Sequence, residues 1–204
     1  TYYHNVYVTD SDPDWEILEA FSKECMMPLT IGGGVQSVAH MRRLLSIGAD
    51  KVSVNSKAVD APDFLTDAAD NFGVQCVVLS MDVKVVDGEY RVVTHGGSAV
   101  RDLEPVEWAV KAAELGAGEI LLNSIDRDGT MTGYDLDLLK SVANAVSVPV
   151  VALGGVGTLD DIVDGFTKGG AHALGCSSIF HFTDNKPVKA SAFADVCGMH
   201  VRHV

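Results

Sequence analysis

Residues Pro28–Val59 read PLTIGGGVQSVAHMRRLLSIGADKVSVNSKAV, and a related stretch, PVVALGGVGTLDDIVDGFTKGGAHALGCSSIF, follows at Pro149–Phe180. The two align without a gap at a shift of 121 positions, from 28 to 149. The matched identities include Pro28 with Pro149, Gly33 with Gly154, Gly34 with Gly155, Gly48 with Gly169 and Ser56 with Ser177. Each copy places a glycine turn between an apolar run and a helical pattern. An internal repeat of this kind predicts a fold built from two related halves.

Outward from the repeat, short apolar runs alternate with amphipathic segments along the chain. The predicted strands are Val6–Thr9, Pro28–Ile31, Lys51–Val54, Cys76–Met81, Glu119–Leu122, Val148–Leu153 and Ala173–Leu174. The predicted helices are Asp14–Lys23, Ser37–Ile47, Pro62–Phe72, Pro105–Leu115, Leu136–Ala145 and Leu159–Lys168. Continuous apolar runs favour parallel strands that are buried on both faces, so the pattern predicts an α/β fold. Asp87-Gly88 predicts a hairpin inserted after the fourth run.

Seven strands and a half-chain repeat indicate a (β/α)8 barrel, which needs eight strands to close. If the halves are equivalent, Cys76–Asp82 opens the second half, and its counterpart would lie before position 1. We therefore expect one domain over residues 1–204 that holds strands 2 to 8, with the first strand and helix missing from this sequence.

Composition narrows the class of protein. The 204 residues are 47% hydrophobic and carry a formal net charge of -13, which disfavours nucleic acids and anionic membranes as partners. No apolar run reaches the ~18 residues that a membrane span requires. Four scattered cysteines favour the buried thiols of a cytoplasmic protein over disulfides or a metal site.

The glycine turns and the strand ends that follow them carry candidate phosphate ligands. Backbone N–H groups at a glycine turn and at a helix N-terminus bind anions, although a plain tight turn is the alternative. The candidates are Gly34 with Asn55 and Ser56 in the first copy, and Gly155 with Ser177 and Ser178 in the second. Two such sites would suit a substrate with a phosphate at each end.

Two acidic segments follow predicted strands. Asp82 ends the run CVVLSM, where its carboxylate would emerge on the catalytic face as a general acid or base. An ion pair with Lys84 is the alternative. The segment NSIDRDGTMTGYD, from Asn123, is either functional or a solvated loop. Because no histidine lies near Asp126 and Asp128, we expect no metal there.

Three further residues have two open interpretations. Lys51 and Glu119 each begin a strand, at the rim opposite the predicted active site, where a structural ion pair is the usual explanation. His95 lies in the loop Thr94–Gly97 on the catalytic face, and either a ligand contact or a simple loop role fits it.

Several blocks resemble the cyclase subunit of imidazole glycerol phosphate synthase, an enzyme of histidine biosynthesis. These are PLTIGGGV, ADKVSVNSKAV, VVLSMDVK, GAGEILLNSIDRDGTMTGYDL, GGVGTLDD and SSIFHF, and the resemblance extends from about Val6 to Arg202. It implies a (β/α)8 barrel that needs no cofactor and receives ammonia from a glutaminase partner at its N-terminal face. The implied substrate is a bis-phosphorylated formimino aminoimidazole carboxamide ribotide, and ring closure makes the enzyme a lyase.

The resemblance also implies roles for residues of this chain. Asp82 matches one of two catalytic aspartates, while Lys51 and Glu119 match charged residues that gate the ammonia entrance. The residues that match the two phosphate sites are Gly34, Asn55 and Ser56 for one, and Asp128, Gly129, Gly155, Ser177 and Ser178 for the other. Asn123 and His95 are added as further candidate substrate contacts.

Departures from the family keep other functions open. The second catalytic aspartate belongs to a first strand that this sequence lacks, and we expect it in the natural protein. Leu153 replaces a small hydroxyl residue before the glycines. The segments ALGGVG and IFHFTDNKP also resemble those of paralogues that supply ammonia for the synthesis of acetamidino sugars of bacterial surfaces. A non-catalytic barrel that binds phosphorylated ligands is the third possibility.

Overall fold

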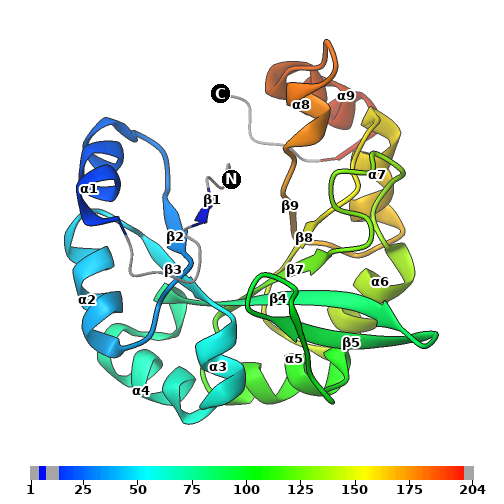
Figure 1. Ribbon diagram of the computed structural model, residues 1–204. Coiled ribbons are helices and arrows are strands. Elements are labelled where there is room, and N and C mark those ends of the chain that lie inside the picture. The colour runs from blue at the N-terminus through cyan, green and yellow to red at the C-terminus, as the bar shows by residue number, and fades with distance from the viewer. Residues whose placement is uncertain (1–4, 8–13, 200–204) are drawn as a thin grey trace.

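The computed structural model describes residues 5–7 and 14–199, and its centre is a curled parallel β-sheet with helices on its outer side (Figure 1). The parallel strands lie in the order β1–β2–β3–β4–β7–β8–β9. Their bounds are β1 Asn5–Tyr7, β2 Thr30–Gly32, β3 Lys51–Val54, β4 Val77–Val86, β7 Glu119–Ser124, β8 Val150–Leu153 and β9 Ala173–Leu174. Within the described residues, β1 and β9 form the two edges and do not pair with each other. The predicted α/β class is confirmed, and the curled sheet is part of a (β/α)8 barrel. The predicted strand Val6–Thr9 extends past Tyr7 into residues outside the described part.

Helices that connect successive parallel strands lie on the outside of the sheet, and α8 and α9 follow its last strand (Figure 1). Their bounds are α1 Trp15–Glu24, α2 Val38–Ser46, α3 Ser56–Asp60, α4 Asp63–Phe72, α5 Pro105–Glu114, α6 Leu136–Ala145, α7 Leu159–Thr167, α8 Ser178–His181 and α9 Pro187–Val196, with the 3-10 turn η1 at Val74–Cys76. All six predicted helices are present, with ends shifted by a few residues. The sequence prediction missed α3, α8 and α9. The first two have one turn each, and α9 buries only Ala190 and Ala194, so none shows a clear apolar period.

The sequence repeat produces a structural repeat in the same register. A shift of 121 positions carries α2, which begins at Val38 and ends at Ser46, onto the bounds of α7. Ser37 caps α2 by accepting a hydrogen bond from the His40 N–H, and Thr158 caps α7 in the same way from the Asp161 N–H. Equal spacing and equal caps therefore start both helices directly after the glycine turns.

Two apolar layers lie on the two faces of the sheet. The larger layer packs the sheet against the helices and includes Leu79, Ile120 and Trp108. The smaller layer lies on the inner face and contains Val78, Leu121 and Val151, one from each of β4, β7 and β8. Because successive side chains of a strand alternate between faces, strands buried on both sides must be apolar throughout. This explains the continuous apolar runs of the sequence.

The predicted hairpin is confirmed and lengthens β4 beyond its expected end. Asp87 and Gly88 have φ values of 52° and 85°, as a tight two-residue turn requires. The chain returns as β5, Glu89–Thr94, which pairs antiparallel with β4, and continues to β6, Ala99–Val100. β4 therefore runs to Val86, past Asp82.

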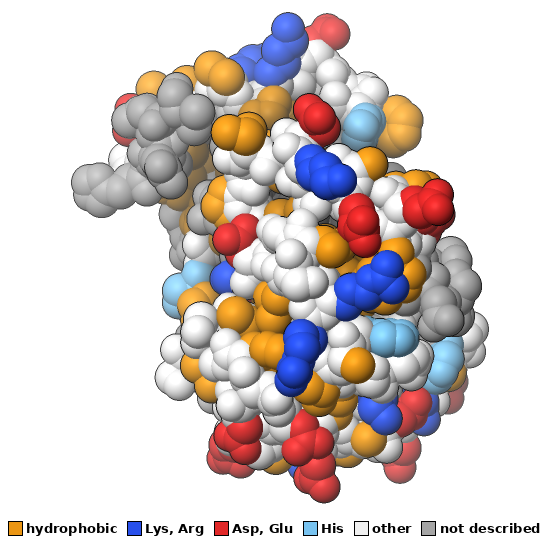
Figure 2. All heavy atoms as spheres, turned by 90° about the vertical axis from the view of Figure 1, so that its left-hand side faces the viewer, with side chains coloured by type: hydrophobic (Ala, Val, Ile, Leu, Met, Phe, Trp, Pro, Cys, Tyr) orange, Lys and Arg blue, Asp and Glu red, His pale blue; other side chains and the backbone are white. Residues whose placement is uncertain are grey.

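Figure 2 shows the surface over α1 and α2, where basic and histidine side chains are interspersed with acidic and apolar ones. The Lys and Arg side chains on this face form no continuous basic stripe of the kind that binds a nucleic-acid backbone. None of the described helices has the length and the apolar character needed to cross a membrane.

Candidate active site

Polar side chains line the inner face of the sheet on β3, β4 and β7. On β4, alternation places Asp82 on the same face as Val78, which belongs to the inner apolar layer. The inner polar residues of these three strands and their ends are Lys51, Ser53, Asn55, Ser80, Asp82, Glu119 and Asn123. Since the carboxyl ends of parallel strands share one edge, Asp82 meets its neighbours there, at the edge where barrel enzymes carry their active sites.

Asp82 lies between two asparagine side chains. Asn55 Nδ2 donates a hydrogen bond to Asp82 Oδ2 at 3.0 Å, and Asn123 Nδ2 donates one to Asp82 Oδ1 at 3.0 Å. Each carboxylate oxygen thus accepts one amide N–H, which is the pattern of an ionised carboxyl group. The alternative of an ion pair with Lys84 is wrong, because Lys84 is exposed and no ion pair among the described residues includes Asp82.

Opposing effects set the pKa of Asp82. Burial raises this pKa above its ordinary value, and the hydrogen bonds from Asn123 and Asn55 act in the opposite direction. The carboxylate of Asp128 raises the pKa further. The net shift is upward. A carboxyl group whose pKa moves toward neutrality is better suited to exchange protons with a substrate near physiological pH.

Residues 125–135 connect β7 to α6 and fold back over the end of β7. The Asp128 N–H donates to the Ser124 carbonyl oxygen at 3.0 Å, and Gly129, with φ of 75°, continues the turn. Asp126 Oδ2 accepts a hydrogen bond from the Val85 N–H at 2.7 Å and so anchors the loop to the β4–β5 hairpin. The segment is thus a structured loop at the carboxyl edge of the sheet. Within the described ranges, no cluster of three or more His, Cys, Asp or Glu residues is placed to hold a metal ion.

This loop packs against the second glycine turn. The Gly133 N–H donates to the Gly155 carbonyl oxygen at 2.8 Å. A Cβ on Gly155 would lie only 2.2 Å from the Gly133 carbonyl oxygen, so the close approach requires glycine. The Tyr134 hydroxyl donates to the Gly175 carbonyl oxygen at 3.1 Å and ties the same loop to the end of β9. The loop that carries Asp128 and Gly129 therefore contacts the segments that follow β8 and β9.

Ser177 and Ser178 follow β9 at the start of α8. Among the described residues their hydroxyl groups make no hydrogen bond, and the Ser177 side chain is exposed. The second predicted phosphate set thus lies on three consecutive strand ends, with hydroxyl donors that a ligand can use.

The first predicted phosphate set is already engaged with the protein. Asn55 Nδ2 donates to Asp82 and also to the Val93 carbonyl oxygen at 3.2 Å. Ser56 Oγ accepts a hydrogen bond from the His95 N–H at 3.0 Å, which places His95 beside this set. Gly34 has φ of 64° at the turn after β2. The Ser56 hydroxyl proton therefore stays available to a ligand, whereas both Asn55 N–H groups already have partners.

Lys51 and Glu119 belong to the inner polar residues but lie at the opposite edge of the sheet from Asp82. Lys51 Nζ is 2.6 Å from Glu119 Oε2, and Glu119 is only 5% exposed. Both residues begin their strands, at the amino edge of the sheet and opposite Asp82. The predicted ion pair therefore exists inside the barrel, and its assignment as an ammonia gate stays a prediction.

The sequence prediction missed a hydrogen-bonded support under the loop after β7. The Tyr90 hydroxyl donates to Asp135 Oδ1 at 3.0 Å, and the same oxygen accepts the Leu138 N–H at 3.2 Å and caps α6. Burial raises the pKa of Tyr90 to about 12, and the hydrogen bond that its hydroxyl donates to Asp135 is the second cause. Nothing in the sequence around Tyr90 predicts its contact with Asp135. The helix cap is predictable, because Asp135 directly precedes the apolar pattern of α6.

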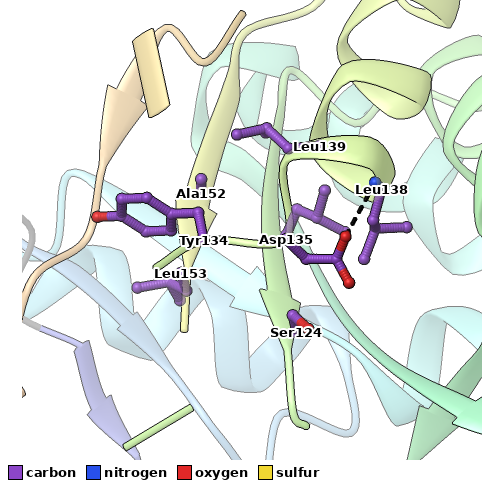
Figure 3. A pocket seen from close by; sticks show the side chains of 8 residues that line it. Ser124, Tyr134, Asp135, Leu138, Leu139, Ala152 and Leu153 are labelled. Carbon is purple, nitrogen blue, oxygen red and sulfur yellow. Dashed lines mark hydrogen bonds between the residues drawn. The ribbon is translucent and has the colours of Figure 1, made fainter. Parts of the chain in front are cut away.

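Figure 3 shows the hollow beside this support, on the helix side of the sheet. It is lined by Leu122, Ser124, Tyr134, Asp135, Leu138, Leu139, Ala152 and Leu153. A second, shallow hollow lies on the outer face of α2, at Ala39, Arg42, Arg43 and Ser46. Neither of these two hollows is lined by Asp82, and the candidate site is defined by the polar groups at the carboxyl edge of the sheet.

The chain was compared with models of known protein families. The family model described as histidine biosynthesis protein matches residues 8–186, and this span contains every residue of the candidate site. The match covers nearly the whole sheet with its helices and is not confined to one motif. The chain therefore belongs to the histidine biosynthesis protein family, a family of barrel enzymes.

Proposed function

We propose that the protein is the cyclase subunit of imidazole glycerol phosphate synthase. It would use ammonia released from glutamine to convert a bis-phosphorylated formimino aminoimidazole carboxamide ribotide into imidazole glycerol phosphate and aminoimidazole carboxamide ribotide. The observation that carries this proposal is Asp82, a carboxyl group with a raised pKa, held at the catalytic edge of a histidine biosynthesis barrel. Asp82 would act there as a general acid or base during ring closure.

The repeated glycine turns support a substrate with a phosphate at each end. Gly34 and Gly155 occupy equivalent places in the two halves, and both have positive φ values, 64° and 104°. A polar strand end lies one βα unit after each turn, with Ser56 in one half and Ser177 in the other. Each half thus offers hydroxyl and backbone N–H donors on the same edge of the sheet, one set for each phosphate.

The opposite edge supports the ammonia route and the partner. Lys51 and Glu119 lie at the amino ends of their strands, inside the column that leads up to Asp82. The large apolar side chains Met26 and Met27 are 94% and 42% exposed directly before β2, on this same edge. We propose that a glutaminase subunit docks there, covers these side chains and delivers ammonia past the ion pair.

The test is ammonia-dependent turnover by the protein from the complete reading frame, together with complementation of a histidine auxotroph. Asp82→Asn is expected to abolish turnover and to leave substrate binding nearly unchanged, because the amide keeps the shape but loses the titratable proton. Asp70→Asn, the same change at an exposed position on α4, is the matched control and should retain full activity. Normal turnover by Asp82→Asn, or no complementation by soluble protein, would reject the proposal. A barrel that binds ligand but never turns over would instead be a non-catalytic binding protein.

One observation favours the paralogous function, an ammonia-supplying subunit for acetamidino sugars. Leu153 lies on the inner face, packed against Val78, Leu121 and Val151, directly before the second glycine turn. An apolar side chain there offers no hydroxyl to a phosphate. Neighbouring genes for sugar biosynthesis, combined with glutamine-dependent ammonia release and no ring formation, would support this second function.

A further inference from the structure

The two amides that hold Asp82 are bonded unequally. Asn55 Nδ2 uses both of its N–H groups, one to Asp82 Oδ2 and one to the Val93 carbonyl oxygen. Asn123 Nδ2 donates to Asp82 Oδ1 and to no other described group. The Oδ1 atoms of Asn55 and Asn123 are both buried and accept no hydrogen bond from the described residues.

This difference decides which amide can turn. Turning Asn55 over would lose two hydrogen bonds and bring its Oδ1 toward the Val93 carbonyl oxygen, which repels it. Turning Asn123 would break one hydrogen bond and bring its Oδ1 to face Asp82. Two oxygens repel while Asp82 is ionised, but a protonated Asp82 has an O–H that Asn123 Oδ1 can accept.

Asn123 Oδ1 is buried against the second glycine turn. A Cβ added to Gly154 would lie only 3.0 Å from this oxygen, so a side chain at position 154 would crowd the amide. Because a half turn of the amide exchanges its oxygen and nitrogen, which are similar in size, the turned amide occupies the same space. Gly154 has φ of 86° and belongs to the second glycine turn. The amide of Asn123 therefore borders the backbone of a substrate-binding turn on one side and the reacting carboxyl group on the other.

We propose that Asn123 is the proton-responsive positioning residue of Asp82, while Asn55 is its fixed counterpart. Asn123 donates an N–H to the ionised carboxylate and turns about its Cβ–Cγ bond to accept the proton of the acid form. The inference deepens the acid–base role proposed for Asp82 and rests on it. Because both protonation states keep two hydrogen bonds, Asp82 can take up a proton and return it within one reaction cycle.

Burial has the largest effect on the pKa of Asp82, and the two amides supply the hydrogen bonds that oppose it. β3 and β7 contribute the neutral side chains of Asn55 and Asn123, β5 contributes the Val93 carbonyl, and the loop after β7 contributes the Asp128 carboxylate. Lys84, on β4 itself, is exposed. Burial and Asp128 raise the pKa of Asp82, and the two amides lower it.

The test is a pH titration followed by nuclear magnetic resonance on protein labelled with ¹³C and ¹⁵N. The Asp82 carboxyl signal is assigned from its loss in Asp82→Asn, and the side-chain NH2 signals of Asn55 and Asn123 are followed in the same samples. The Asn123 signals are expected to shift with the midpoint of the Asp82 titration, and those of Asn55 to shift much less. Asn123→Ala should raise the proton affinity of Asp82 by about fivefold, because it removes one hydrogen bond from each protonation state and the bond to the ionised state is the stronger of the two. Asn71→Ala, which removes an exposed amide on α4, should leave the Asp82 titration unchanged.

If the NH2 chemical shifts of Asn123 stay constant while Asp82 titrates, the inference is wrong. It is also wrong if the NH2 shifts of Asn55 change as much as those of Asn123. If Asn123→Ala does not fold, the amide signals of the unsubstituted protein decide the question alone. The measurement needs no turnover, so its outcome is separate from that of the proposed function. Coupled titration in a protein without cyclase activity would reject only the function, and flat signals in an active enzyme would reject only the role of Asn123.

Discussion

Replacement of Gly155 by alanine tests whether the second glycine turn holds the loop after β7. Gly155 has φ of 104°, and a Cβ there would lie 2.2 Å from the Gly133 carbonyl oxygen and 3.0 Å from Arg127 Cβ. The Gly133 N–H donates to the Gly155 carbonyl oxygen at 2.8 Å. Because backbone and not a flexible side chain occupies the space, the alanine must push the two segments apart and break this hydrogen bond.

The expected loss of stability has three parts. A side chain at positive φ costs roughly 1–2 kcal/mol. Overpacking against a fixed neighbour costs about 1–3 kcal/mol. Loss of one backbone hydrogen bond costs about 1 kcal/mol. The free energy of unfolding should therefore fall by about 3–6 kcal/mol, a large part of the roughly 5–15 kcal/mol typical of a domain.

Gly129→Ala is the matched control in the same loop. Gly129 has φ of 75°, but a Cβ there meets nothing within 4 Å, so only the roughly 1–2 kcal/mol of backbone strain applies. The assay is urea unfolding of both variants and of the unsubstituted protein at neutral pH. If Gly155→Ala loses no more stability than Gly129→Ala, the close approach of the two segments is absent in solution and the placement of the loop is wrong.

Three further predictions concern titration and thiol reactivity. Burial raises the pKa of Asp82 in the folded state, so its carboxyl group favours folding below the unfolded pKa and loses this contribution as pH rises through the folded pKa. The unfolding free energy of the protein minus that of Asp82→Asn should fall across that window, and a constant difference would contradict the burial argument. Tyr90→Phe should lose about 1 kcal/mol at neutral pH through its hydrogen bond to Asp135. The stability that Tyr90 contributes below its unfolded pKa should disappear as pH rises to about 12, and the phenylalanine variant should lack this decline. Exposed Cys197 should react quickly with a thiol reagent, and partly buried Cys176, whose pKa burial raises, much more slowly; equal rates would refute this.

Much of the fold was predictable because its periodic features are local. The shift of 121 positions placed both glycine turns and the two helices after them in equivalent positions, and the caps at Ser37 and Thr158 determine where those helices begin. The one-turn helices α3 and α8 were not predictable, since a single turn shows no apolar period. The helix α9 packs through small alanines and shows little amphipathic pattern.

The candidate site was predictable in position but not in its bonding. Asp82 follows an apolar strand, and parallel strands end at one edge, so its place on the catalytic face follows from the chain order. The bonding of its carboxylate does not follow from chain order. Asn55 was expected to contact phosphate, and the structure shows that its side chain also bonds Asp82 and the Val93 carbonyl oxygen, which the predicted hairpin brings to this edge. Its role toward phosphate stays a prediction.

By itself, the sequence determined the α/β class, the repeat, the glycine turns and the strand ends at which Asp82 and Asn123 stand, because these depend on composition and spacing along a single segment. The tertiary structure alone decided that Asn55 and Asn123 enclose Asp82, that Lys51 pairs with Glu119, and that Gly133 bonds Gly155. These contacts join residues from different strands and loops, and they exist only once the strands have paired and the loops have packed. The proton affinity of Asp82 depends on that enclosure, so no reading of its own strand could have supplied it.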